Sequence, residues 1–177
     1  MKRFVKAAVL TLTIALTGCA ATVQRQDANS APLASTNAAG KKLSLYVTGS
    51  QVSTTSADWE KLRGEWRSAM TGAAAAAGIP FTYYSTDPQP QSDSGTLVVV
   101  QVNDYRYLSA MTRFLLGVMA GNAFIDAEVS YYELPDRKLL GSKKYNTSSS
   151  ASQGIFSAMT SKQLEALSAD IVKEVSR

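Results

Sequence analysis

Hydrophobic and polar residues alternate along several stretches of the chain. A period of two is typical of a strand with one buried face, and a continuous apolar block such as Leu97 to Val100 is typical of a central strand buried on both faces. Polar turns rich in Pro, Gly and Asp separate these stretches. The pattern predicts about five strands, at residues 41–50, 81–85, 95–108, 123–134 and 138–147.

Two other stretches repeat apolar residues every three or four positions, which predicts amphipathic helices over residues 57–77 and 161–175. We place Ser56 at the N-cap of the first helix and Gly78 just after its end, where a left-handed residue is common. For the second helix, Thr160 and Gln163 have the spacing of a capping box.

The predicted order is therefore β-α-β-β-β-β-α. A strand–helix–strand start favours parallel neighbours, whereas the alternating pair 123–134 and 138–147 favours an antiparallel hairpin. We expect an α/β (α+β) domain with a single mixed, largely antiparallel sheet on which both helices pack.

The start of the chain has a different composition. Lys2, Arg3 and Lys6 precede the uncharged apolar residues 7–15, which is the pattern of a secretory signal peptide. The apolar run is too short to cross a bilayer, which takes about 20 residues. The residues that follow, Leu16-Thr17-Gly18-Cys19, resemble the lipobox of bacterial lipoproteins. An ordinary signal peptide with a chance cysteine is the alternative.

The lipobox resemblance implies specific covalent chemistry at Cys19. In bacterial lipoproteins the cysteine thiol takes a diacylglyceryl group, the leader is removed, and the new amino group is usually acylated. Ala20, rather than Asp, follows the cysteine, and the sorting rule of enteric lipoproteins then implies the outer membrane, with the protein facing the periplasm. We expect no cofactor beyond this covalent lipid on Cys19.

The resemblance also divides the chain. We expect a signal peptide at 1–18, a lipidated flexible tether at 19–40 and a single periplasmic domain at 41–177. The tether is rich in small and polar residues, and as a coil it would span roughly 25 Å; the alternative is that part of it packs on the domain. Removing the leader leaves 15 basic and 14 acidic residues, a balance that argues against nucleic acid as a partner.

The residue types limit the catalytic chemistry. The chain has no histidine, which excludes His-dependent triads and histidine-based zinc sites. No Ser-x-x-Lys, Gly-x-Ser-x-Gly or glycine-rich phosphate loop occurs either. We therefore predict no catalytic residue, no metal site and no enzyme. The alternative is an envelope-polymer hydrolase that uses Asp126 and Glu128, whose carboxylates would lie roughly 7 Å apart on one strand face; the same pattern also fits a solvated strand face.

Residues 114–121 are apolar throughout and contain Gly117 and Gly121 in a GxxxG spacing. If exposed, the segment would be an interface for another chain or for lipid. If buried, it would be a turn or a short helix between strands, with glycines for tight backbone geometry. The candidate interface residues are Arg113, Phe114, Leu115, Leu116, Gly117 and Gly121.

Paired tyrosines form a second candidate surface. They flank Arg106 and recur on the other predicted strands, either as an aromatic binding surface or as ordinary strand residues with one wet face. The tyrosines are Tyr83, Tyr84, Tyr105, Tyr107, Tyr131 and Tyr132.

The motif Arg113-Phe114-Leu115-Leu116-Gly117, followed by Gly121-Asn122-Ala123, an acidic alternating strand, a turn and a C-terminal helix, resembles a widespread domain of unknown function in bacterial lipoproteins. The resemblance covers residues 41–175 and implies a fold and a location, but no reaction or ligand. We expect a non-enzymatic binding or assembly module of the cell envelope. Its partners would be the membrane, through the acyl chains, and either a second copy or another envelope protein.

Overall fold

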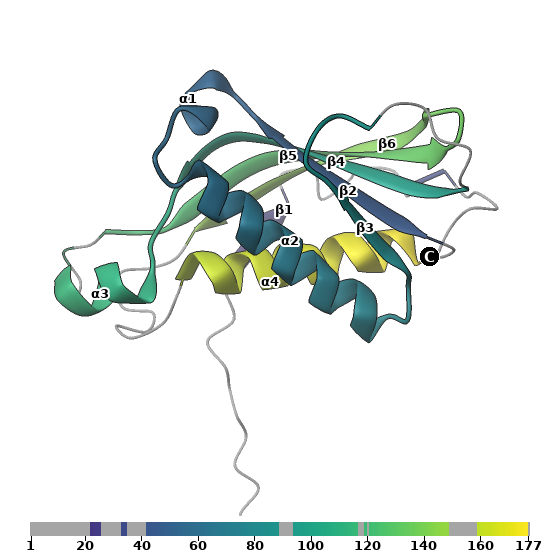
Figure 1. The fold of residues 1–177 in the computed structure, drawn as a ribbon. Helices are drawn as coiled ribbons and strands as arrows, with labels where there is room; N and C mark the ends of the chain where they lie inside the picture. The colour runs from purple at the N-terminus through teal and green to yellow at the C-terminus, as the bar shows by residue number, and fades with distance from the viewer. Residues whose placement is uncertain are drawn as a thin grey trace, which may run out of the picture.

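A computed structural model of the protein describes residues 22–25, 33–34, 42–88, 94–116, 119, 121–148 and 159–176. Six strands form one sheet in the order β1-β6-β5-β4-β2-β3, and helices α2 and α4 lie together on one side of it (Figure 1). The elements are β1 (Thr22–Arg25), β2 (Leu43–Gly49), α1 (Gln51–Thr54), α2 (Trp59–Ala76), β3 (Phe81–Tyr84), β4 (Gly95–Arg106), α3 (Ala110–Leu116), β5 (Phe124–Leu134), β6 (Lys138–Ser148) and α4 (Met159–Val175).

The sheet is mixed, as predicted. Strand β2 pairs in parallel with β3 and β4, whereas β4 pairs antiparallel with β5, and β5 antiparallel with β6. The two predicted helices are the long ones, α2 and α4. The prediction of two helices and about five strands was incomplete, because α1, α3 and β1 are additional. All three are short, so their sequences are too brief to show a period.

Part of the segment that we expected to be a tether belongs to the domain. Thr22 to Arg25 form β1, which adds to the edge of the sheet beside β6. Further along, the amide of Ala34 donates to the carbonyl of Leu140 at 3.1 Å, and Leu33 packs against the core. The expectation of a flexible tether over all of 19–40 was therefore wrong, and the alternative, that part of it packs on the domain, is confirmed.

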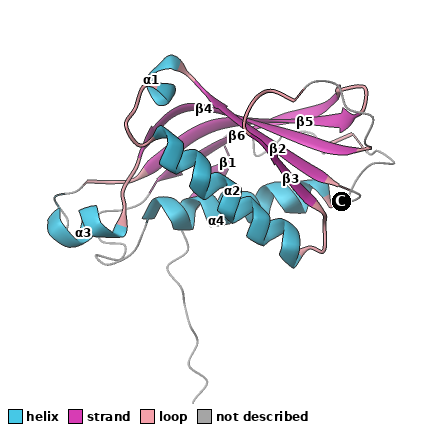
Figure 2. Ribbon diagram, viewed as in Figure 1, coloured by secondary structure: helices cyan, strands magenta, loops and turns pink. Residues whose placement is uncertain are grey.

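The core lies between the sheet and the two long helices (Figure 2). Leu45, Val100 and Ile125 are fully buried on the helix side of their strands, opposite Trp66 of α2 and Leu167 of α4. The alternate residues of β4, β5 and β6 point to the other face, which carries many polar side chains. The sheet therefore has one dry face and one largely wet face, as antiparallel sheets often do.

The end of α2 shows how local sequence sets the fold. The amide of Ile79 donates to the Ala74 carbonyl at 2.9 Å, and that of Gly78 to the Ala75 carbonyl at 3.1 Å. Gly78 has a φ of +69°, and this pair of hydrogen bonds is a Schellman motif. The predicted role of Gly78 is confirmed. Ile79, which is buried, then directs the chain back under the sheet towards β3.

The start of α2 differs from the prediction. In this part of the chain the capping serine is Ser50: its hydroxyl accepts from the Ser53 amide at 3.2 Å and begins the short helix α1. Asp58 precedes α2 and makes no side-chain cap. The expectation that Ser56 is the N-cap was wrong, because the chain makes this extra turn before α2 begins.

A buried ion pair joins α4 to the sheet. The Lys143 Nζ lies 2.6 Å from Glu174 Oε2, and the two side chains are only 6% and 1% exposed. Lys143 comes from the helix side of β6 and Glu174 from the last turn of α4. Removing two charges from water is costly, and the pair offsets that cost only while both partners are present.

We predict that Glu174→Leu lowers the free energy of unfolding by about 3–5 kcal/mol, because it leaves the buried Lys143 ammonium without the carboxylate that neutralises it. Chemical denaturation would measure the change. The double variant Lys143→Met with Glu174→Leu should regain most of the loss. A double variant as unstable as the single one would contradict this account.

Candidate functional site

Helix α3 lies in the connection between two neighbouring strands. Arg106 at the end of β4 pairs with Phe124 at the start of β5. A tight turn is enough to join antiparallel neighbours, yet the chain runs outwards from residue 107 and returns only at residue 123. Figure 1 shows α3 beyond the end of the sheet. Ser109 begins the helix, since its hydroxyl accepts from the Thr112 amide at 3.1 Å.

The first turn of α4 holds both ends of this connection. The Leu108 amide donates to Thr160 Oγ1 at 2.9 Å, and Gln163 Nε2 donates to the Ala123 carbonyl at 3.0 Å. Leu108 and Ala123 are buried together in a small core of their own. Our prediction of a Thr160–Gln163 capping box was therefore wrong: these side chains hold a distant loop, whose buried backbone groups would otherwise lack partners.

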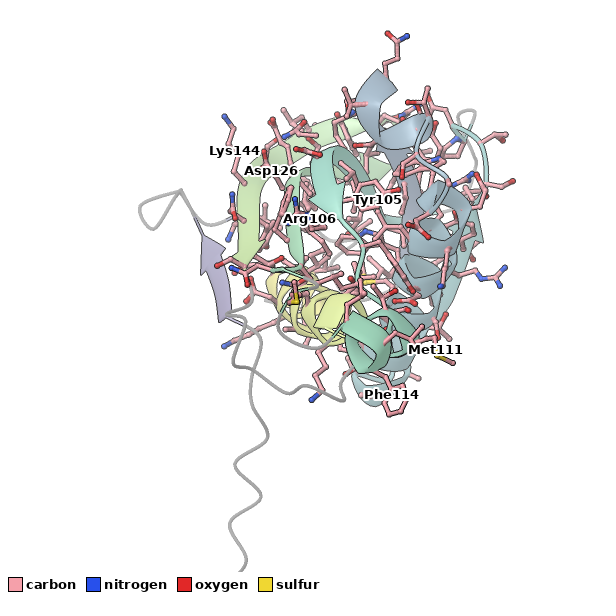
Figure 3. The ribbon with its side chains drawn as sticks, turned by 90° about the vertical axis from the view of Figure 1, so that its left-hand side faces the viewer. Tyr105, Arg106, Met111, Phe114, Asp126 and Lys144 are labelled. Carbon is pink, nitrogen blue, oxygen red and sulfur yellow. The ribbon has the colours of Figure 1, made fainter. Side chains whose placement is uncertain are left out.

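The connection carries large apolar side chains into solvent. Their exposed fractions are 65% for Met111, 65% for Phe114, 69% for Leu115, 56% for Leu116 and 89% for Met119. We call these five residues the α3 surface. Figure 3 looks onto this end of the molecule and shows Met111 and Phe114 on its outside, on the other side of the molecule from Asp126 and Lys144. Clustered apolar exposure of this kind marks an interaction site.

The sequence left open whether this segment is core or interface. Phe114, Leu115 and Leu116 are exposed, as an interface requires, so these three residues do not belong to the core. Arg113 belongs to α3, but its side chain is not described, and Gly117 lies outside the described residues. Met111 and Met119 were not among the predicted interface residues. Met111 lies three positions before the apolar run 114–121, so a wider window would have included it, whereas Met119 lies within the run.

Gly121 has a role different from that of an interhelical GxxxG. It follows the helix in non-helical backbone with a φ of +78°, and an added Cβ would lie 2.9 Å from Arg106 Nη1. The GxxxG interpretation, in which the two glycines allow close packing against another chain, therefore does not account for Gly121. Gly121 is needed for the left-handed turn into β5, which is the local reason that the sequence offered as the alternative.

Asp126 and Glu128 share the wet face of the sheet, as predicted. In Figure 3, Asp126 lies away from Met111 and Phe114 of the α3 surface. Their cross-strand neighbours are polar side chains of the kind found on any solvated strand face: Asp104 and Asn146 for Asp126, and Gln101 and Lys144 for Glu128.

The tyrosines do not form one surface. The hydroxyls of Tyr131 and Tyr145 lie 3.2 Å apart inside the core, where burial raises the pKa of Tyr131. Tyr105 packs against Trp59 with ring centroids 6.3 Å apart. Tyr107 donates to the carboxylate of Glu65 on α2, and burial, followed by that carboxylate, raises its pKa. These contacts favour the interpretation of the tyrosines as strand residues.

A groove of about 450 Å³ runs between α2 and α4. Its charged side chains include Glu65, whose carboxylate accepts from Tyr107 and, at 2.7 Å, from the Ser161 hydroxyl. These bonds tie α2 to α4 and to the residue that follows β4. Within the described ranges, no group of three acidic or cysteine side chains is placed to hold a metal ion. Among those same residues, no helix is both long and apolar enough to cross a membrane.

Comparisons with known proteins support the fold. A single-substitution variant of PelC from Paraburkholderia phytofirmans, solved as a dodecamer, superposes with a TM-score of 0.50 at 13% identity, over 88% of this chain and 96% of that one. At 13% identity, this similarity shows that the two chains share a fold and nothing further. A Xanthomonas campestris protein of the DUF330 family has a TM-score of 0.47 at 10% identity, over 75% of this chain and 81% of that one. No family model and no curated protein matches the sequence.

We predict that Thr160→Val lowers the free energy of unfolding by about 1–3 kcal/mol, because the buried Leu108 amide loses its acceptor while the side-chain shape is kept. Hydrogen exchange should also speed up at the Leu108 amide and along α3. Thr160→Ser, which keeps the hydroxyl, serves as the control and should change both much less. Equal effects of the two substitutions would show that the hydroxyl is not the group that matters.

Proposed function

We propose that the protein is a lipid-anchored envelope protein of the outer membrane, facing the periplasm, and that its domain is a non-enzymatic binding or assembly module. The observation that carries the proposal is the α3 surface. Five large apolar side chains project from one connection whose ends are fixed by hydrogen bonds to Thr160 and Gln163. A surface held in this way is available for binding without a change of fold.

Energetics supports a covered state for this surface. Fully burying one large apolar side chain contributes about 1.5–3 kcal/mol. Phe114, Leu115 and Met119 contribute little of this within the domain, since more than half of each side chain is exposed. Because both ends of the connection that carries α3 are held by hydrogen bonds, binding there costs less ordering of the chain than a mobile loop would.

The anchor is the other half of the proposal. We expect a lipid on Cys19 that keeps the domain at the membrane, and no cofactor besides it. The dodecamer formed by the PelC variant makes a second copy of this chain one partner to test. The absence of histidine and the solvated setting of Asp126 and Glu128 support a non-enzymatic module.

We predict that Cys19→Ala abolishes labelling by an alkyne fatty acid in cells and leaves the leader uncut by the lipoprotein peptidase, because the thiol is the acylation site. Gel mobility and click detection would measure both effects. Ala20→Ser, which changes the next residue and keeps the thiol, is the matched control and should be labelled and cut normally. Labelled and processed Cys19→Ala protein would refute the anchor.

The binding role has a separate test based on thiol protection in cells. Phe114→Cys and Leu139→Cys place a thiol at sites that are 65% and 54% exposed in the isolated chain. Each variant is treated with a small water-soluble maleimide in intact cells, and its reaction rate is divided by that of the same variant unfolded in urea. We predict that the thiol at position 114 reacts several-fold more slowly than the thiol at position 139. Equal normalised rates would show that the α3 surface is uncovered, and would contradict the binding role.

A further inference from the structure

The register of the sheet places the beginning of β1 at the same end as α3. Thr22 pairs with Ser148, Ser148 pairs with Phe124, and Phe124 pairs with Arg106. These four residues form one row across the sheet. Neighbouring strands lie roughly 4.8 Å apart, so Thr22 and Arg106 are separated by about 14 Å. Helix α3 begins only a few residues after Arg106, at Ala110.

Few residues separate the proposed lipidation site from β1. Cys19 precedes Thr22 by three positions. A fully extended chain covers at most about 3.6 Å per residue, so the Cys19 Cα lies no more than about 11 Å from that of Thr22. A lipid on Cys19 would therefore bring this end of the sheet, and not the hairpin end at residues 135–137, up to the bilayer. Because Thr22 to Arg25 are paired with β6, the domain cannot move away from the anchor as a long coil would allow.

The chemistry of α3 suits a membrane surface. The helix spans Ala110–Leu116, far short of the roughly 20 residues that cross a bilayer. Among its described side chains, the exposed ones are Met111, Phe114, Leu115 and Leu116, while the part-buried hydroxyls of Ser109 and Thr112 bond to each other at 3.0 Å. Short apolar helix faces of this kind can lie in the headgroup region and bury their apolar side chains about 5–10 Å deep.

We infer that the α3 surface is occupied by the surface of the bilayer that holds the acyl chains of Cys19. This inference rests on the proposed lipid anchor. The domain then has two membrane contacts at one end, a covalent one through the chain before β1 and a non-covalent one through α3. Two contacts fix the orientation of the sheet, so that its hairpin end points away from the membrane.

Fluorescence quenching by lipid tests this placement directly. The lipidated protein carrying Phe114→Trp is incorporated into phosphatidylethanolamine–phosphatidylglycerol vesicles, with or without bromine on the acyl chains. The native Trp59 and Trp66 are buried, so their emission is subtracted using the unsubstituted protein. Leu139→Trp is the matched control, because Leu139 is an exposed apolar residue of the hairpin end. Circular dichroism checks that both variants are folded.

We expect brominated lipid to reduce the added emission at position 114 by on the order of twofold, since shallow acyl-chain positions lie within the depth that an interfacial helix reaches. Emission added at position 139 should not change. If the protein floats with the vesicles but brominated lipid does not quench the emission at position 114, the inference is overturned and the anchor stands. Equal quenching at positions 114 and 139 would have the same meaning. If the emission at position 114 is not quenched, cross-linking of two copies through that position would show that a second copy covers the α3 surface. Lipid-independent sedimentation of the unsubstituted protein would overturn the anchor, and this inference with it.

Discussion

The double pairing of β4 determines the arrangement of the other elements. This strand is parallel to β2 on one side and antiparallel to β5 on the other. Parallel neighbours require a crossover, and α2 makes the one that leads from β2 to its other parallel neighbour, β3, packing Leu62, Trp66 and Met70 against the sheet. An antiparallel neighbour requires no crossover, so the connection from β4 to β5 does not have to cover either face of the sheet. The apolar helix α3 is found in that connection, outside the core.

The positions of α2 and α4 follow from the same constraint. Once α2 covers one face, α4 completes that layer beside it, and its last turn is fixed by the ion pair between Glu174 and Lys143. The other face carries Gln101, Glu128 and Lys144. One consequence is that the two ends of the sheet differ in chemistry. One end carries an apolar helix, and the other carries the hairpin turn at Pro135.

Sequence periodicity predicted the features that depend on neighbours along the chain. The long strands and helices were found because each repeats its apolar positions several times, and Gly78 was assigned correctly because a Schellman motif needs a left-handed residue at that position. Features that depend on distant partners were missed. Thr160 bonds to Leu108 and not within its own helix, and β1 is defined by backbone pairing with β6, which its sequence gives no reason to expect.

The sequence identified the apolar residues of the candidate site, but it did not predict that they lie on the surface. An apolar run such as 114–116 has the same pattern whether it is buried or exposed, since periodicity reports which residues share a face and not what covers that face. Only the tertiary position of α3, beyond the last paired residues Arg106 and Phe124, decides the matter. For the same reason Gly121 could be read as half of a packing motif, although its φ shows that the backbone itself needs a glycine there.

The pairing of β1 with β6 has a mechanical consequence. A force applied to the chain ahead of Thr22 pulls along the strand axis, because β1 begins at the end of the sheet and runs antiparallel to β6 from Ser148 to Tyr145. Such a load shears all the interstrand hydrogen bonds of β1 at once, instead of opening them one after another as a perpendicular pull would. The short edge strand is therefore oriented to resist detachment when the domain and the chain that precedes it are drawn apart.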